Sequence, residues 1–278
     1  DRLYAEKDSV TGVIITSADG TAWTQVTTAS NLYLRDIAWD GTTYVASADA
    51  GDILKSTNLS SWTRVDLPSF SVHYAIATGG GTFAAVGSGG EIWTSTDTTT
   101  WVSRNSNGAF WRFGDVQFLN NQFIAVGAQG SIYTSANGNA WTRATAANGS
   151  WAHSVPFGAG LYVVRTDFGD IVTSPNGVTW TNRTVADNVD NNGVTYGNSR
   201  FIVVGSAGKI RSSTDGITWT NVTGTGITVN LRSVAARGNT FVATGDSGKI
   251  YSSADGQTWT ELTSGTTQRL WRVRVVDG

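Results

Sequence analysis

With 278 residues, the chain is long enough to form one large domain, and its 12 Trp residues give it more aromatic surface than a disordered polypeptide carries. A formal net charge of −2, with no long run of like charges, gives no electrostatic footprint for nucleic acid or an anionic membrane. The chain contains no Cys, which excludes disulfides, thiolate nucleophiles and Cys-based zinc sites, and no apolar run is long enough to span a bilayer.

Strand-like segments begin close to the N-terminus. We expect strands at Arg2–Lys7 and Val13–Ser17, and a further strand directly after Trp23. Short segments rich in Val, Ile, Thr and Tyr, joined by Gly, Asn and Asp, are typical of an all-β protein. The 33 Gly residues agree with many tight turns, and no ten-residue stretch keeps helical periodicity.

The segment that ends at Trp23 is the first copy of a repeated phrase, Gly-x-Ile-x-x-Ser-x-Asp-Gly-x-x-Trp-Thr. Successive copies lie 39 or 40 residues apart, and the path from the last Trp through the C-terminus and on from Asp1 to the first Trp is 42 residues. The repeat therefore closes on itself around the two termini. The seven repeated tryptophans are Trp23, Trp62, Trp101, Trp141, Trp180, Trp219 and Trp259.

Each copy of the repeat contains four strand-like pieces. Four strands at this period predict a β-propeller blade. A WD40 array would carry Gly-His and Trp-Asp pairs, which this chain lacks, and kelch repeats are longer. In the unit before the last Trp, the four pieces are Leu231–Ala236, Thr240–Thr244, Lys249–Ser253 and Thr258–Leu262.

The last segment, Leu270–Val276, is predicted to be an innermost strand whose blade continues at Arg2–Lys7. The seventh blade is then built from both ends of the chain, and this exchange seals the ring. The prediction is an all-β fold: one domain, residues 1–278, forming a seven-bladed β-propeller with four antiparallel strands in each blade and a composite closing blade.

The phrase Ser-x-Asp-Gly-x-x-Trp resembles the Asp-box, or BNR, repeat of sialidases, xyloglucan-degrading glycosidases, sortilin-type receptors and photosystem II assembly factors. The resemblance covers the whole chain, although four boxes deviate in their Asp or Gly and the spacing is one residue shorter than in most sialidases. Asn58, Asn137 and Asn176 replace Asp, while Leu59 and Thr98 replace Gly. The complete boxes are Ser17-Asp19-Gly20-Trp23, Ser213-Asp215-Gly216-Trp219 and Ser253-Asp255-Gly256-Trp259.

The residues of the box have a structural role at the hairpin between the third and fourth strands. An Asp or Asn side chain accepts backbone N–H bonds, Gly adopts a positive φ, and Trp packs between strands. The occurrence of Asn at three positions suits hydrogen bonding better than acid–base chemistry. The resemblance also implies that the boxes lie on the face opposite a functional site.

Candidate functional residues precede the buried anchor of each innermost strand. The anchors are Ile37, Ile76, Val116, Val155, Val194, Val234 and Val273. We expect the residues before them to line the mouth of the central channel, with forked Arg donors and stacking aromatic rings for an anion or a sugar. The candidate ligand-binding residues are Arg35, Tyr74, Arg112, Trp151, His153, Asn192, Arg232 and Arg272.

Further polar and aromatic residues fall in the same rim loops. Both histidines of the chain are among them, and Asp36, Asp115 and Asp190 add carboxylates. The alternative interpretation is that each Arg and His pairs with a neighbouring Asp or carbonyl and simply lines a solvated channel. The additional aromatic residues are Tyr33, Phe110, Trp111 and Trp271.

Acidic loops are candidate calcium-binding sites, since Asp and Asn oxygens suit that ion. Examples are Ser47–Asp52 and Arg165–Asp170. No loop has the spacing of an EF-hand, so we expect no metal site and no cofactor.

Two classes of function remain open. A sialidase would need an arginine triad, which Arg35, Arg232 and Arg272 resemble, and a Tyr–Glu pair that the few Glu residues do not supply. There are three alternatives to a recognition module. The first is a glycosidase with a carboxylate pair such as Asp36 and Asp115, the second is a lyase with a His or Tyr base, and the third is an assembly scaffold.

We expect a secreted, periplasmic or cell-surface monomer that acts as a non-catalytic recognition module. Its partner would be a carbohydrate or an extracellular protein, bound at the face opposite the boxes. The Thr-, Ser- and Asn-rich, Lys-poor composition favours this location.

Overall fold

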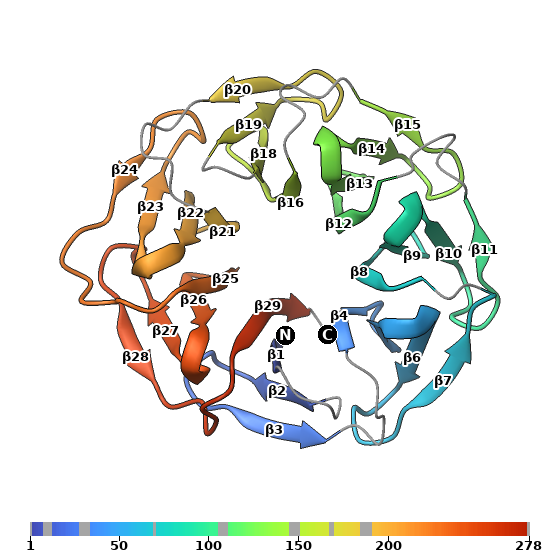
Figure 1. The fold of residues 1–278 in the computed structure, drawn as a ribbon, viewed down its shortest axis with the longest axis horizontal. Coiled ribbons are helices and arrows are strands. Elements are labelled where there is room, and N and C mark those ends of the chain that lie inside the picture. Colours follow the sequence, from blue (N-terminus) through green and yellow to red (C-terminus); the bar gives the residue numbers. More distant parts are fainter. Residues whose placement is uncertain are drawn as a thin grey trace.

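The computed structural model describes residues 2–7, 13–27, 34–68, 71–104, 111–144, 151–166, 170–183 and 191–276. Seven antiparallel sheets stand around a central axis as the blades of a propeller (Figure 1). Within each blade the strands run in order from the axis to the periphery, so the predicted fold class is confirmed. The described residues contain short 3-10 turns but no α-helix.

Blades 1 to 4 follow the chain from residue 34. Blade 1 consists of β4 (Leu34–Trp39), β5 (Tyr44–Ala48), β6 (Asp52–Ser56) and β7 (Thr63–Asp66). Blade 2 consists of β8 (His73–Gly79), β9 (Thr82–Gly87), β10 (Ile92–Ser95) and β11 (Val102–Ser103). Blade 3 consists of β12 (Phe113–Leu119), β13 (Gln122–Gly127), β14 (Ile132–Ser135) and β15 (Thr142–Arg143). Blade 4 consists of β16 (Ala152–Ser154), β18 (Leu161–Thr166), β19 (Ile171–Ser174) and β20 (Thr181–Arg183), with a short β17 (Phe157–Gly158) also paired to β18.

Blades 5 to 7 complete the ring. Blade 5 consists of β21 (Asn191–Gly197), β22 (Arg200–Gly205), β23 (Ile210–Ser213) and β24 (Thr220–Asn221). Blade 6 consists of β25 (Leu231–Arg237), β26 (Thr240–Gly245), β27 (Ile250–Ser253) and β28 (Thr260–Leu262). Blade 7 consists of β29 (Leu270–Val276), β1 (Arg2–Lys7), β2 (Val13–Ser17) and β3 (Thr24–Thr27).

The composite closing blade is confirmed. The innermost strand β29, red in Figure 1, pairs with the blue β1 in an antiparallel register that matches Arg2 with Val276 and Ala5 with Val273. The two ends of the chain are therefore joined by backbone hydrogen bonds, and β1 is paired on both sides, with β29 and with β2.

The core lies between neighbouring blades rather than inside any one of them. The second strands are apolar on both faces, and Phe123, Phe201 and Phe241 are fully buried. One cluster joins Ala84 and Val86 of blade 2 to Phe113 and Phe123 of blade 3. Burying each such ring contributes roughly 2 kcal/mol, so each blade is stabilised mainly by its neighbours.

The repeated box closes the hairpin between the third and fourth strands. In blade 5, Ser213 Oγ accepts the Gly216 N–H at 2.8 Å, and Asp215 Oδ1 accepts the N–H groups of Ile217 and Thr218 at 2.8 and 2.7 Å. The Trp219 indole N–H donates to the Gly216 carbonyl at 3.2 Å. The box residues thus hold their own turn.

Asn performs the same task as Asp. Asn58 Oδ1 accepts the N–H groups of Ser60 and Ser61, both at 3.0 Å. The residue after each box Asp or Asn has a positive φ in all seven copies, including Leu59 at 66° and Thr98 at 61°. These two side chains occupy a conformation that favours glycine.

We predict that Thr98→Gly raises the free energy of unfolding by about 1 kcal/mol, because a β-branched side chain is strained in the left-handed region. For a domain of this size the melting temperature should rise by roughly 2–4 °C. Thr100→Gly is the matched control: Thr100 lies in the same hairpin without a positive φ, so its replacement should lower stability. Equal effects of the two changes in thermal melts would contradict the role of strain.

The boxes also predict an acid dependence of stability. Backbone N–H groups that donate to the ionised carboxylates hold the pKa of Asp97, Asp215 and Asp255 at about 2, and bonds from Thr21 hold the pKa of Asp19 well below its usual range. Because these pKa values are lower in the folded state, the stability they provide is complete above about pH 4 and is lost as pH falls towards 2.

Replacing all four box Asp residues with Asn should therefore flatten the decrease in melting temperature between pH 5 and pH 2, since the Asn copies already present hold the same turn without titrating. Asp66→Asn is the control, because the Asp66 side chain is 75% exposed and lies outside the boxes. A quadruple variant whose melting temperature falls with pH as steeply as that of the parent would refute this account.

Candidate functional site

A β-bulge interrupts the first strand of every blade near its beginning. The pairing skips one residue, for example between Leu34 and Asp36 in β4 and between Leu231 and Ser233 in β25. Bulges redirect side chains and are common beside functional sites. The skipped residues are Arg35, Tyr74, Gly114, His153, Asn192, Arg232 and Trp271.

Five of the eight predicted site residues occupy this bulge position. Arg112 and Trp151 precede their strands, and Arg272 follows the bulge of β29. In blade 3 the bulge residue is Gly114, whose missing side chain leaves room for Trp151: an added Cβ would lie 3.4 Å from the Trp151 Nε1. The predicted anchors Ile37, Val116 and Val234 are buried, as are the other four.

The first group of predicted residues forms a stacked row, here called the ladder, across blades 1 to 4. The Arg112 guanidinium lies 3.8 Å from the Trp151 ring centroid and 4.9 Å from that of Tyr74. On one side Arg35 lies 5.9 Å from the Tyr74 ring, and on the other His153 stacks on Trp151 with centroids 5.1 Å apart. Arg112 is exposed, so this cation–π stack faces solvent.

The second group, here called the Trp271 platform, lies at blades 6 and 7. The Trp271 side chain is 42% exposed, and the guanidinium carbons of Arg232 and Arg269 lie 5.2 and 4.6 Å from its ring. Asp246 accepts two bonds from Arg232, at 2.8 and 2.9 Å, and one from Arg269 at 2.7 Å. The Arg232 bond, with Asn230 and Arg269, also lowers the Asp246 pKa, so the carboxylate stays ionised and fixes both guanidinium groups.

Several predicted residues pair with a neighbouring Asp or backbone carbonyl, as expected if they simply line a solvated channel. Arg35 donates to both oxygens of Asp49, at 2.7 and 3.0 Å, in the blade 1 equivalent of the Arg232–Asp246 pair. Asn192 donates to the Leu231 carbonyl at 2.8 Å and so joins blade 5 to blade 6. These contacts fix the two side chains in place.

His73 does not lie at the rim, where the sequence interpretation put both histidines. It begins β8, and its side chain is fully buried 3.7 Å from Glu91. Burial lowers its pKa to about 4 despite the opposing effect of Glu91, so the imidazole is neutral at pH 7. Its burial could not be predicted from its position next to Tyr74 in the sequence.

Two arginines of β29 reach across the channel to two buried carboxylates. Arg274 donates from Nε and Nη2 to Asp36 at 2.9 and 3.0 Å, and from Nη2 to Asp115 at 2.6 Å. Arg272 donates to Asp115 and, at 3.1 Å, to the Tyr74 carbonyl. Both Asp side chains are fully buried and both Arg side chains are 20% exposed.

This four-residue cluster, here called the clasp, ties the closing blade to blades 1, 2 and 3. Burial acts to lower the Arg274 pKa, but Asp36 and Asp115 outweigh it and raise the pKa, so the guanidinium is charged at every physiological pH. Asp36 also accepts the Ile76 N–H at 3.1 Å. Arg272 was predicted at this site, whereas Arg274 was not.

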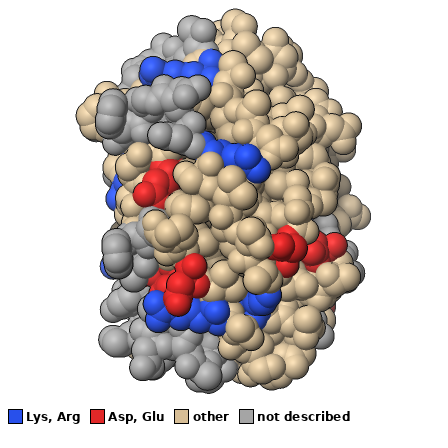
Figure 2. Space-filling view, turned by 90° about the vertical axis from the view of Figure 1, so that its right-hand side faces the viewer, with Lys and Arg blue, Asp and Glu red and all other residues tan. Residues whose placement is uncertain are grey.

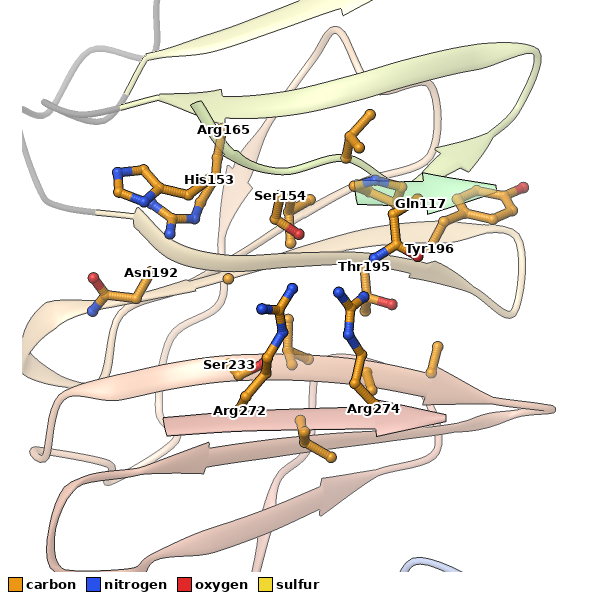
Figure 3. A pocket seen from close by; sticks show the side chains of 18 of the residues that line it. Gln117, His153, Ser154, Arg165, Asn192, Thr195, Tyr196, Ser233, Arg272 and Arg274 are labelled. Carbon is orange, nitrogen blue, oxygen red and sulfur yellow. The ribbon is translucent and has the colours of Figure 1, made fainter. Parts of the chain in front are cut away.

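A cavity of about 580 Å³ occupies the channel beside the clasp. The innermost strands of blades 3 to 7 supply most of its wall, with His153 and Asn192 at one end and Tyr196 at the other (Figure 3). Arg272 and Arg274 point side by side into it, and Ser154 and Thr195 lie opposite. Four of the eight predicted residues line this cavity, namely His153, Asn192, Arg232 and Arg272.

The other four, Arg35, Tyr74, Arg112 and Trp151, form the ladder beside the cavity rather than its wall. The sequence analysis did not predict Arg274 or Gln117 as site residues. It named Trp271 only as an additional aromatic residue and not as part of the binding site. Arg274 follows Arg272 by two positions in a strand, which places both side chains on one face. Tyr33, Phe110 and Asp190 lie outside the described residues.

Seen from its edge, the disc carries few charged side chains, in small separate groups (Figure 2). In the part of the chain that the structure describes, no three His, Asp or Glu side chains gather closely enough to hold a metal ion. The described part of the chain also contains no helix that is long and apolar enough to cross a membrane. The expectation of no metal and no cofactor stays a prediction.

Solved structures of similar fold include a protein that is named as a lyase and one whose name states no enzymatic activity. YCF48 bound to D1 peptide matches with a TM-score of 0.70 and 16% identity over 83% of this chain and 81% of its own. YCF48 from Cyanidioschyzon merolae gives 0.72 and 17% over 89% and 90%, and virginiamycin B lyase from Staphylococcus aureus gives 0.74 and 12% over 83% and 84%. No protein-family model and no curated protein matches the sequence. At these identities the likeness shows the β-propeller fold.

We predict that Arg274→Met lowers the free energy of unfolding by about 3 kcal/mol, because it leaves two buried carboxylates with one cation. Arg269→Met is the matched control: the Arg269 side chain is 37% exposed and Asp246 keeps Arg232, so the loss should stay below about 1 kcal/mol. Urea unfolding of both variants measures the difference. Similar losses would show that the clasp is no stronger than a rim ion pair.

Proposed function

We propose that this propeller is a non-catalytic recognition module that binds carbohydrate at the mouth of its central channel. The observation that carries the proposal is the Trp271 platform, an exposed indole on the cavity wall with two arginines packed against it. Sugar rings stack their C–H faces on such aromatic surfaces while polar groups beside the ring fix their orientation.

The polar groups needed for orientation surround the same opening. Arg232 and Trp271 line the cavity from blades 6 and 7, and His153 and Asn192 line it from blades 4 and 5. Since Asp246 and the Leu231 carbonyl already fix Arg232 and Asn192, little side-chain entropy is lost when a ligand binds. A preorganised mouth supports binding of a ligand that enters from this side.

The arrangement of carboxylates favours binding over catalysis. Asp36 and Asp115, the pair considered for a glycosidase, are fully buried and bonded to Arg272 and Arg274. A general acid or nucleophile must reach the bond that it cleaves. We therefore propose that the protein binds carbohydrate without cleaving it, and we assign it no lyase reaction.

A polypeptide partner is the second candidate, and the ladder favours it. The ladder extends across four blades as a row of alternating cations and rings, which suits an extended chain with acidic or aromatic side chains. YCF48, of similar fold, has been solved with a D1 peptide. For either partner we propose an extracytoplasmic location, in keeping with the Asp-box resemblance and the Lys-poor composition.

Trp271→Ala should weaken binding of carbohydrate by about five- to thirtyfold without lowering the melting temperature, because stacking on one exposed ring contributes about 1–2 kcal/mol. A glycan array identifies the ligand, and calorimetry measures the affinity of parent and variant. Ile217→Ala, at an exposed residue in a box hairpin, is the control and should leave the affinity unchanged.

Release of new reducing ends or unsaturated sugars from the bound glycan would contradict the non-catalytic assignment. An array without any bound glycan, combined with capture of a defined peptide that depends on Arg112 and Trp151, would replace carbohydrate by polypeptide as the partner.

A further inference from the structure

The side chains that line the central cavity carry charges of one sign only. Four arginines and one histidine belong to its wall, namely Arg165, Arg232, Arg272, Arg274 and His153, and none of the Asp and Glu residues that the structure describes belongs to it. We propose, resting on the proposed function, that the cavity binds the carboxylate of an acidic sugar unit, a uronic acid within the bound glycan. The acidic sugar would be the unit that enters the channel.

The clasp gives the cavity its anion-binding geometry. Asp36 and Asp115 hold the two guanidinium groups, but their side chains are fully buried and do not belong to the cavity wall. Arg274 uses Nε and Nη2 for Asp36 and Asp115, and its Nη1 has no hydrogen-bond partner among the described residues. The donors that remain point into the cavity and are preorganised for a planar carboxylate.

The charge balance of the clasp favours a monoanion. Two arginines and two aspartates sum to zero, so the attraction comes from oriented N–H donors near the ligand, with the opposing carboxylates set farther away. A singly charged carboxylate is matched by such donors without needing a net charge of +2. The partly enclosed, low-dielectric channel strengthens these bonds relative to those in water.

The rest of the wall suits a sugar ring. Ser154 and Thr195 place hydroxyl groups opposite the arginines, and Ser233 places one beside Arg272 (Figure 3). A volume of about 580 Å³ lies within the range of pockets that enclose small organic ligands. Hydroxyl groups of the ligand thus find partners around the carboxylate site, and the Trp271 platform lies at its entrance.

The experiment compares acidic trisaccharides with neutral copies of the same size. Trimers of galacturonic acid and of glucuronic acid are measured by calorimetry beside the same trimers with every carboxyl methyl-esterified. We expect at least tenfold tighter binding of one acidic trimer than of its ester, and a loss of this advantage in 0.5 M NaCl, since salt screens the ion pair. Equal affinities for acid and ester would overturn the carboxylate site while leaving carbohydrate recognition intact.

A substitution that leaves the clasp complete tests the position of the site. Ser233→Asp puts a carboxylate on the cavity wall beside Arg272, where it should compete for the guanidinium donors and remove the preference for the acidic trimer (Figure 3). Ser233→Asn is the neutral variant of the same size and should keep it. An unchanged preference in Ser233→Asp would place the anion elsewhere and overturn the proposal.

The final comparison separates the two sources of a carboxylate. A panel of random tetrapeptides with free C-termini is measured beside the same panel with C-terminal amides. Selective binding of free C-termini, without binding of either trimer, would assign the cavity to a polypeptide and overturn the uronic-acid proposal. If neutral glycans, acidic trimers and peptides all fail to bind the folded protein, the proposed function fails with it.

Discussion

The clasp is the interaction on which the closed ring and the cavity both depend. Its two cations come from β29 in the closing blade, and its two carboxylates come from β4 and β12 in blades 1 and 3. Burying Asp36 and Asp115 without these partners would be costly, so the channel is stable only with β29 in place. The same two arginines line the cavity, which links the integrity of the fold to the anion site proposed there.

The repeat explains the scaffold, and the bulges explain how seven similar blades present different residues at one position. Each bulge redirects one residue at the start of an innermost strand. Since no backbone requirement fixes the side chain there, the position holds Arg in two blades, Gly in one and an aromatic ring or a polar group in the others. Gly114 shows the consequence best, because its blade borrows Trp151 from the next segment. The mouth is therefore asymmetric on a symmetric frame.

Much of the fold could be predicted from the sequence because periodicity and turn chemistry are local signals. β1, β2 and β29 begin and end at the predicted residues, and the strands of blade 6 agree within one or two. The site was harder to predict from the sequence because it depends on contacts between distant segments. Arg274 meets Asp36 across 238 positions, and His73 is buried although its neighbour Tyr74 reaches the rim. In blade 3 the residue two positions before the anchor Val116 is Gly114, whereas Arg112 lies two positions further towards the N-terminus, before β12 begins.

The composite blade has a consequence for biosynthesis. Because β29 follows every other strand of the ring in the chain, the six preceding blades and the β1–β3 sheet emerge from the ribosome before the arginines that neutralise Asp36 and Asp115 exist. Until then Asp36 and Asp115 lack the guanidinium partners that they have in the closed ring, and the channel lacks its arginine pair. Closure of the ring and placement of the two arginines in the channel are thus one event in the synthesis of the chain.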